Sequence, residues 1–143
     1  MDELSYISNH VFVKLKPSRV QGVGVFALRE IPAGVELFKP WTGPTGVYSI
    51  SEEFLKSLPK ELYSHIKDIF LYATNFPVDT NTYVTLTNGC HWIYTTPYYF
   101  VNSDIKKFNI DKDTLTTVRK IKIGEEILSN YGRYERLPKQ ELI

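Results

Sequence analysis

Short runs of alternating apolar and polar residues open the chain, with the two-residue period of β-strands. Residues 11–15, Val-Phe-Val-Lys-Leu, alternate in the manner of a strand that is buried on one face. Gly22 and Gly24 punctuate the loop that follows, and an apolar run over 25–28 predicts the second strand of a hairpin. A third short strand is predicted over 35–38, so the first part of the chain is expected to be all β.

The pattern becomes helical in the middle of the chain. Ser51 and the two glutamates that follow it have the sequence of a helix N-cap with acidic residues in the first turn. Pro59 separates this helix from a second one over 60–72, in which apolar residues recur at helical spacing. We therefore predict a helical insert over about 51–73 whose role is packing.

Strand signals return in the last part of the chain. Residues 82–87 are rich in threonine, valine and tyrosine, and the Asn-Gly pair at 88–89 predicts a hairpin turn, with 92–94 pairing back. Residues 118–123 alternate again and predict a further strand. A final helix is predicted over 134–142, although Pro138 limits it.

Together these elements predict one mainly β domain with a helical insert, of the α+β class. The chain has 143 residues, which is the size of an ordinary single domain, and no repeat or linker divides it. We expect a single domain over 1–143, with a core over about 11–135 and a tail over 133–143.

Composition and charge narrow the classes of function. Seventeen basic and sixteen acidic side chains give a net charge of +1, which argues against nucleic acid as a direct partner. Cys90 is the only cysteine, so disulfides and a cysteine-built zinc site are excluded and a reducing compartment is expected. The acidic start is unlike a signal peptide, and no apolar run is long enough to cross a membrane. A soluble, intracellular protein is expected, in nucleus or cytoplasm.

Some candidate groupings carry little chemistry. The three histidines share no ligand spacing, so we expect no metal site. Glu125 and Glu126 are consecutive, and consecutive residues of an extended strand point to opposite faces, which argues against a joint acid/base pair.

Four segments carry more pattern than a small β-rich domain needs. In chain order they are 21–27 (Gln-Gly-Val-Gly-Val-Phe-Ala), 38–43 (Phe-Lys-Pro-Trp-Thr-Gly), 100–103 (Phe-Val-Asn-Ser) and 121–132 (Ile-Lys-Ile-Gly-Glu-Glu-Ile-Leu-Ser-Asn-Tyr-Gly). In this order they resemble the four motifs of the SET domain, the fold of S-adenosylmethionine-dependent protein lysine methyltransferases. The resemblance covers about residues 11 to 135.

The third motif departs from the SET pattern at two positions, and Trp41 in the second motif occupies a place that the family more often gives to tyrosine. Ser103 stands where the family has a histidine, which contacts the cofactor largely through backbone atoms. Asn109, near the family's second asparagine, comes one residue late and without a preceding proline. These departures are similar to the PR subgroup of SET domains, which also lacks that histidine.

The resemblance implies a fold of several small, short-stranded sheets with a knotted C-terminal segment. It also implies S-adenosylmethionine as the cofactor and transfer of its methyl group to the ε-amine of a lysine in a protein. The implied cofactor-binding residues are Gln21, Gly22, Val23, Gly24, Tyr83, Phe100, Asn102 and Ser103. The implied catalytic residue is Tyr131, and the implied walls of the lysine channel are Trp41, Tyr98, Tyr99 and Tyr134.

Each role has a chemical reason and a plainer alternative. Gly22 and Gly24 would let backbone amides approach the cofactor's carboxylate, and a plain hairpin turn is the alternative. Asn102 would bind the cofactor's ammonium group through an oxygen atom, and a turn or strand cap is the alternative. An aromatic channel beside a sulfonium lowers the pKa of a substrate lysine, and the Tyr131 hydroxyl orients the resulting amine. Core packing is the alternative for every aromatic candidate.

The function predicted from the resemblance is therefore methylation of a protein lysine, with a histone tail as the leading substrate. A catalytically inactive SET-like or PR-like module that binds a peptide or a partner protein is the alternative, because Ser103 and Asn109 depart from the pattern. An unrelated small β-rich domain with coincidental motifs is a third reading.

Overall fold

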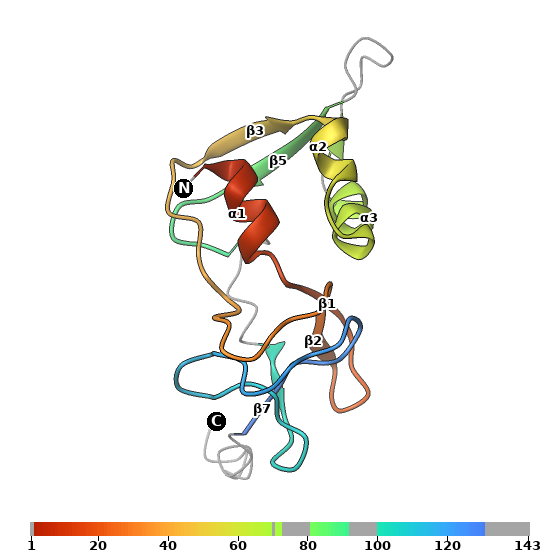
Figure 1. The fold of residues 1–143 in the computed structure, drawn as a ribbon, viewed down its shortest axis with the longest axis vertical. Coiled ribbons are helices and arrows are strands. Elements are labelled where there is room, and N and C mark those ends of the chain that lie inside the picture. Colours follow the sequence, from red (N-terminus) through yellow and green to blue (C-terminus); the bar gives the residue numbers. More distant parts are fainter. Residues whose placement is uncertain (1, 70, 73–80, 92–99, 131–143) are drawn as a thin grey trace, which may run out of the picture.

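The computed structural model of the protein describes residues 2–69, 71–72, 81–91 and 100–130. The helices are α1 (Glu3–His10), α2 (Glu52–Lys56) and α3 (Lys60–Ile69), and the strands are β1 (Val13–Pro17), β2 (Val23–Ala27), β3 (Gly46–Ile50), β4 (Leu71–Tyr72), β5 (Thr82–Leu86), β6 (Asn102–Ser103) and β7 (Leu128–Ser129). Figure 1 shows β3, β5 and the helices at one end of the molecule and the β1–β2 hairpin with β7 at the other.

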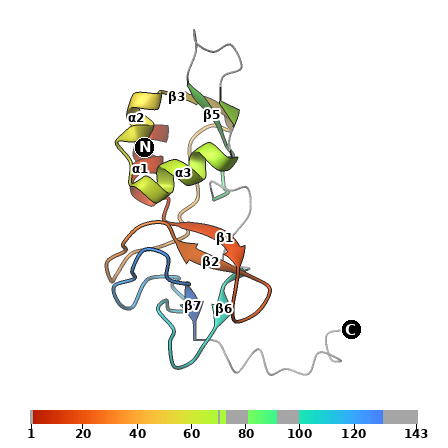
Figure 2. The same ribbon diagram turned by 90° about the vertical axis from the view of Figure 1, so that its right-hand side faces the viewer.

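The described strands form three small sheets. β1 and β2 make an antiparallel hairpin, β5 pairs antiparallel with both β3 and β4, and β6 pairs parallel with β7. Figure 2 shows β6 and β7 side by side below the hairpin. The prediction of a mainly β protein built from small sheets and short helices is confirmed. The predicted knotted segment and tail helix involve residues 131–143, which lie outside the described residues.

The hairpin and the strand at β5 form as predicted, and the helical insert forms over α2 and α3. Its predicted end is wrong: residues 71–72, which the pattern assigns to the second helix, form strand β4, because they pair with β5. Ser51 caps α2, because its side chain accepts a hydrogen bond from the Phe54 amide at 3.2 Å. Glu52 then reaches α3, where it receives the Tyr63 hydroxyl at 2.9 Å and pairs with Lys67 at 3.1 Å. The Asn-Gly turn after β5 is present, with Gly89 at φ +83°, while its predicted partner over 92–94 lies outside the described residues.

Two predicted strands are wrong. Residues 35–38 make one isolated bridge, from Glu36 to Thr116, and residues 118–123 make one, from Ile121 to Ile31. Both segments are joined to distant residues by short pairs of backbone hydrogen bonds, and neither pair extends into a continuous ladder. Val35 accepts from Thr117 and Leu37 donates to Leu115, while Ile121 and Ile31 exchange two bonds. Conversely, the sequence pattern does not predict β3, because Gly43 and Pro44 precede it and Gly46 begins it. Its pairing with β5 overrides that local signal.

The sequence pattern also does not predict helix α1. Asp2 caps it by accepting a hydrogen bond from the Ser5 amide at 2.7 Å, and Tyr6 and Ile7 are fully buried. The Tyr6 ring lies edge-on to Trp41 with centroids 5.4 Å apart, and its hydroxyl donates to the Lys39 carbonyl at 2.8 Å. The helix therefore closes one core of the protein.

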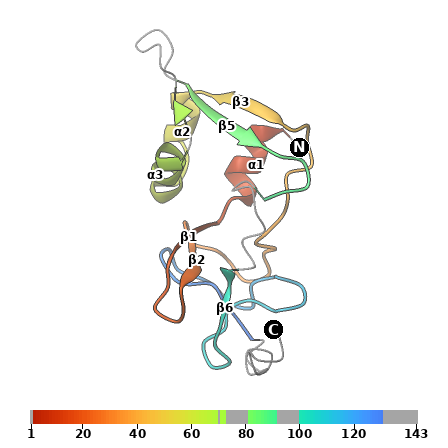
Figure 3. The same ribbon diagram turned by 180° about the vertical axis from the view of Figure 1, so that it is seen from behind.

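The buried apolar side chains form two clusters. One lies between α1, the insert helices, β3 and β5 and includes Trp41. The other lies around the β1–β2 hairpin and includes Val101 and Ile127. Figure 3, from behind, shows α1 and the start of β1 connecting the two ends of the molecule. Arg29 reinforces this connection by donating to the Ser8 carbonyl at 2.7 Å.

None of the helices that the structure describes is long and apolar enough to cross a membrane.

His91 is a buried titratable group next to the second cluster. It is 4% exposed, and its ring lies edge-on to Phe38 with centroids 6.3 Å apart. Within the described part of the chain neither ring nitrogen has a hydrogen-bond partner. Burial lowers the pKa of His91 to about 4, from 6.5, because the imidazolium would lose its hydration.

We expect Tyr6→Ala to lower the free energy of unfolding by about 3 to 5 kcal/mol, because it opens a cavity beside Trp41 and leaves a carbonyl unpaired. Leu4→Ala is the matched control on the same helix, since Leu4 is 38% exposed, and should cost less than about 1 kcal/mol. Urea denaturation measures both values. Equal denaturation midpoints for the two variants would show that α1 is not packed as described.

His91 should make stability fall with acidification. Its folded pKa of about 4 lies below its unfolded value, so the unfolded chain binds more protons between about pH 6.5 and pH 4. This contribution is complete above about pH 6.5 and is lost as pH falls toward 4. Replacing the imidazole by His91→Leu should reduce the loss of unfolding free energy between pH 7 and 4.5 by about 2 kcal/mol. Denaturation of both proteins across that pH range checks it, and parallel curves would contradict it.

Candidate functional site

The edge of β2 that faces away from β1 carries backbone groups that β1 does not use. Ser18 donates its amide to the Gly22 carbonyl at 2.7 Å, and Pro17 stands opposite Val23 in the register. In an antiparallel pair the residues next to a hydrogen-bonded pair point their backbone groups away from the partner strand. This register tolerates Pro17, which has no N–H, and turns the Val23 carbonyl outward.

The segment 124–127 covers that outward edge. Ile127 donates its amide to the Val25 carbonyl at 2.7 Å. Ala27 donates to the Glu125 carbonyl and accepts from the Gly124 amide, both at 2.9 Å. The turn that sequence analysis predicts at Gly124 is confirmed, with φ +82°, and it starts this contact. Residues a hundred positions apart are thereby fixed against each other.

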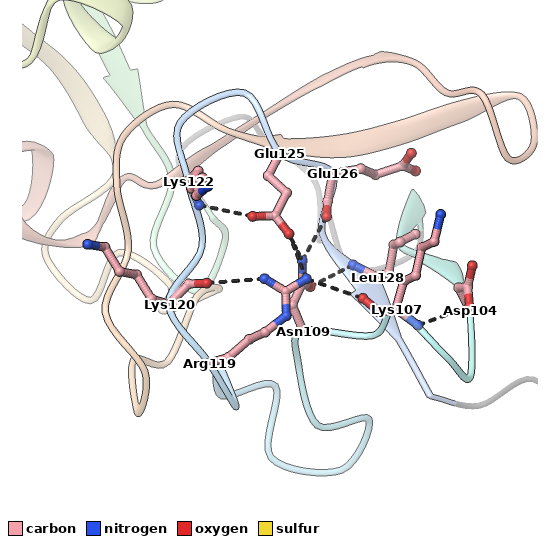
Figure 4. A network of polar contacts seen from close by, with 9 residues as sticks. All are labelled: Asp104, Lys107, Asn109, Arg119, Lys120, Lys122, Glu125, Glu126 and Leu128. Carbon is pink, nitrogen blue, oxygen red and sulfur yellow. Dashed lines mark hydrogen bonds and ion pairs between the residues drawn. The ribbon is translucent and has the colours of Figure 1, made fainter.

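Asn109 holds the same segment from its other side, as Figure 4 shows. Its side chain is fully buried, donates to the Glu126 carbonyl at 2.8 Å and accepts from the Leu128 amide at 2.8 Å. Its backbone amide also donates to the Leu128 carbonyl at 2.9 Å. Asn109 therefore has a structural role in this protein, and its polar groups are used within the fold.

Glu125 and Glu126 point in different directions, as the sequence predicts. The Glu125 carboxylate receives Arg119 at 2.6 Å and the Lys122 amide at 3.0 Å. Partial burial alone would raise the pKa of Glu125, but the bond from Arg119, together with the Lys122 amide, holds that pKa below its ordinary value. The Glu126 carboxylate extends away from this network in Figure 4 and faces the β1–β2 loop instead.

Asn102 lies where β6 meets that loop. Its amide nitrogen Nδ2 is within hydrogen-bond distance of four oxygens: Ser18 Oγ at 3.0 Å, Glu126 Oε2 at 3.0 Å, the Gln21 carbonyl at 3.1 Å and the Val23 carbonyl at 3.5 Å. The Ser18 hydroxyl also donates to the Glu126 carboxylate at 2.8 Å. The pairing of β6 with β7 places Asn102 opposite Leu128 and so sets this position.

The two glycines of the loop are required for different reasons. Gly22 has φ +49°, a conformation that residues with a Cβ rarely adopt, and open space surrounds it. Gly24 has no such φ, but a Cβ there would collide with the Glu126 carboxylate and with the Ser18 side chain. The Gly-x-Gly pattern therefore permits both the turn and the close approach of Glu126.

Several predicted site residues are thus brought together: Gln21, Gly22, Val23, Gly24, Asn102 and Ser103. Ser103 is buried, and its hydroxyl donates to the Ser129 carbonyl at 3.1 Å, so this contact fastens β6 to β7. Phe100, two residues before Asn102, is 37% exposed. Their roles toward a cofactor stay predictions.

Trp41 belongs to the buried cluster that contains Tyr6, and Tyr83 lies on β5, so neither is part of the site at the glycine loop. Trp41 is 1% exposed between Tyr6 and Tyr48, and its indole N–H donates to the Pro44 carbonyl at 3.0 Å. The packing alternative is sufficient to explain this placement. Tyr83 is on β5, opposite Ser49. The predicted residues Tyr98, Tyr99, Tyr131 and Tyr134 lie outside the described residues.

Sequence reasoning missed two members of the site, Ser18 and Glu126. Ser18 accepts hydrogen bonds from Asn102 and from the Val20 amide at 2.9 Å while donating to Glu126. Two sequence features point toward these residues: Ser18 stands at the start of the glycine loop, and Glu126 points to the face opposite that of Glu125. Among the described residues no three histidine, cysteine or acidic side chains gather in the manner of metal ligands.

Comparisons with known proteins add little. No family model matches the chain, and no curated protein matches it. A crystal structure of a Plasmodium falciparum protein described as a "putative histone methyltransferase" is similar with a TM-score of 0.35 and 19% sequence identity, over 86% of this chain and 95% of that chain. At that TM-score the similarity assigns neither a fold family nor an activity. The described residues define a mainly β protein with a polar site at a Gly-x-Gly hairpin.

We expect Asn109→Ala to lower the free energy of unfolding by about 2 to 4 kcal/mol, because it leaves the Leu128 amide and the Glu126 carbonyl without their side-chain partner. The control is Asn9→Ala, the same change at an exposed position of α1, which should alter stability by less than about 0.5 kcal/mol. Thermal and urea denaturation measure both. A loss of unfolding free energy in Asn109→Ala no larger than that in Asn9→Ala would contradict the structural role of Asn109.

Proposed function

We propose that this protein transfers a methyl group from S-adenosylmethionine to the ε-amine of a lysine in another protein, with a histone tail as the leading substrate class. The proposal starts from the ordered resemblance of four sequence motifs to the SET domain. One structural observation supports it most. Three of those motifs, the glycine loop, Asn102 and the segment 124–129, meet at one place although Ser18 and Glu126 are 108 positions apart.

The residues at this place fit the proposed cofactor. An α-amino acid end carries an ammonium and a carboxylate, and an ammonium is bound by oxygen acceptors. Around the loop these acceptors are the Gln21 and Val23 carbonyls and the carboxamide oxygen Oδ1 of Asn102. The conformation of Gly22 exposes loop backbone that a carboxylate could approach. The cofactor itself supplies an electrophilic methyl group on a sulfonium.

The substrate side of the proposal rests on the resemblance alone. A lysine amine attacks a methyl group only after it loses its proton, and an apolar aromatic channel lowers the pKa of that amine. Tyr131 follows β7 by two residues in the sequence and would orient the neutral amine through its hydroxyl. Tyr98, Tyr99 and Tyr134 would enclose the lysine stem.

A second candidate function is a catalytically inactive module of the same type that binds a peptide or a partner protein. The observation in its favour is that Asn102 Nδ2, Ser103 Oγ and the Glu126 carboxylate already have protein partners. A site whose polar groups satisfy each other is stable without a ligand. Binding of S-adenosylmethionine, measured together with methyl transfer, separates the two functions.

The first test measures transfer of labelled methyl groups from S-adenosylmethionine to a mixture of histones and lysate proteins. We expect label on lysine with the wild type and about 100-fold less with Tyr131→Phe, because the amine loses the group that orients it. Tyr48→Phe is the matched control, since it removes a hydroxyl that donates to the Pro44 carbonyl at the opposite end of the molecule. That variant should retain full activity.

Thermal denaturation with S-adenosylmethionine completes the test. A ligand at 100 times its dissociation constant should stabilise the fold by about 2.7 kcal/mol. Stabilisation without label would favour the catalytically inactive module, because the cofactor would then bind without transferring its methyl group. Neither stabilisation nor label would reject the proposed function and direct the search to a partner protein.

A further inference from the structure

The orientation of the Asn102 carboxamide is fixed by chemistry. Every oxygen around its Nδ2 atom is an acceptor there: two are backbone carbonyls, one belongs to the Glu126 carboxylate, and the fourth is Ser18 Oγ. The Ser18 hydroxyl has one proton and donates it to the Glu126 carboxylate, at 2.8 Å. It can therefore only accept a hydrogen bond from Asn102. An oxygen in place of Nδ2 would face these acceptors without a donor.

The other end of the carboxamide is therefore turned the opposite way. Asn102 is partly exposed, and within the described part of the chain no group donates a hydrogen bond to its Oδ1 atom. An amide oxygen without a donor, near two backbone carbonyls and a carboxylate, attracts a donor with positive charge. The site therefore favours a positively charged ligand group, while the Glu126 carboxylate repels a negatively charged one.

We infer that Ser18 and Glu126 are positioning residues for the ligand: they hold the Asn102 carboxamide so that Oδ1 receives an ammonium group. This inference rests on the proposed function, in which that ammonium is the α-amino group of the cofactor. Glu126 acts through Asn102 by accepting from Nδ2, and Gly24 makes room for its carboxylate. Ser18 fixes the position of that carboxylate through both of its oxygens, at 2.9 and 2.8 Å.

The test compares two ligands that differ only in the ammonium. They are S-adenosylhomocysteine and its analogue with hydrogen in place of the α-amino group. Calorimetry gives the ratio of their dissociation constants for the full-length wild type, for Glu126→Met and for Glu126→Gln. The ratio of dissociation constants reports how strongly the ammonium is recognised. A general loss of structure weakens the binding of both ligands by the same factor and leaves this ratio unchanged.

We expect the wild type to prefer the ligand with the ammonium, and Glu126→Met to reduce that preference by about tenfold, the value of one hydrogen bond to a charged group. Glu126→Gln keeps one acceptor oxygen for Nδ2 and should recover most of the preference. Glu125→Met is the matched control. Its carboxylate bonds to Arg119 and not to Asn102, so this variant should lose stability and keep the wild-type ratio.

The outcomes separate this inference from the proposed function. If the wild type binds neither ligand nor S-adenosylmethionine, the proposed function fails and the inference fails with it. If the wild type binds both ligands equally, or if Glu126→Met keeps the wild-type ratio within about twofold, only the inference is overturned and the proposed cofactor stands. A ratio that falls equally in Glu125→Met would also overturn it, because the effect would then come from a loosened turn.

Discussion

The outward edge of β2 is the constraint on which the site depends. The register of the β1–β2 hairpin turns the backbone groups of Val23, Val25 and Ala27 away from β1. The chain returns a hundred residues later and pairs segment 124–127 with two of these positions, and Asn102 takes the third. A slip of one residue in the hairpin would exchange these faces and remove every one of these contacts.

The return of the chain is secured more by a buried amide than by the charges around it. Asn109 is fully buried and bonds to the backbone on both sides of Ile127, so loss of its side chain leaves buried groups unpaired. The ion pair between Arg119 and Glu125, at 2.6 Å, is shorter than the side-chain hydrogen bonds of Asn109, at 2.8 Å, but its side chains are 45% and 29% exposed. Exposed ion pairs contribute about 1 kcal/mol or less, so this pair mainly fixes the direction of the turn.

The sequence was informative where a local rule decides the structure. The Ser51 cap, the break at Pro59 and the Asn-Gly turn after β5 all need only a few neighbouring residues, and each was found. It was misleading where a distant partner decides. Residues 35–38 alternate without forming a ladder, while 46–50 form one because β5 lies beside them.

The candidate site follows the same division. The glycine loop and Asn102 were predicted from motifs, because those motifs list the residues that a ligand would touch. Ser18 and Glu126 were missed, because nothing within a few positions of either residue indicates that they meet across 108 positions. The opposite directions of Glu125 and Glu126 follow from extended backbone alone, but the partner that each would find does not.

The polar contacts of the site also limit what kind of ligand it can take. A ligand that used Asn102 Nδ2 as a donor would have to break its bond to the Glu126 carboxylate, at a cost of about 1.5 to 3 kcal/mol. A ligand cation at Oδ1 breaks nothing and gains the nearby negative charge. Binding a cationic group therefore costs less free energy than binding an anionic one. The hydrogen bonds among Ser18, Asn102 and Glu126 that stabilise the site without a ligand also orient the carboxamide. A binding module and an enzyme built on this site would share that preference.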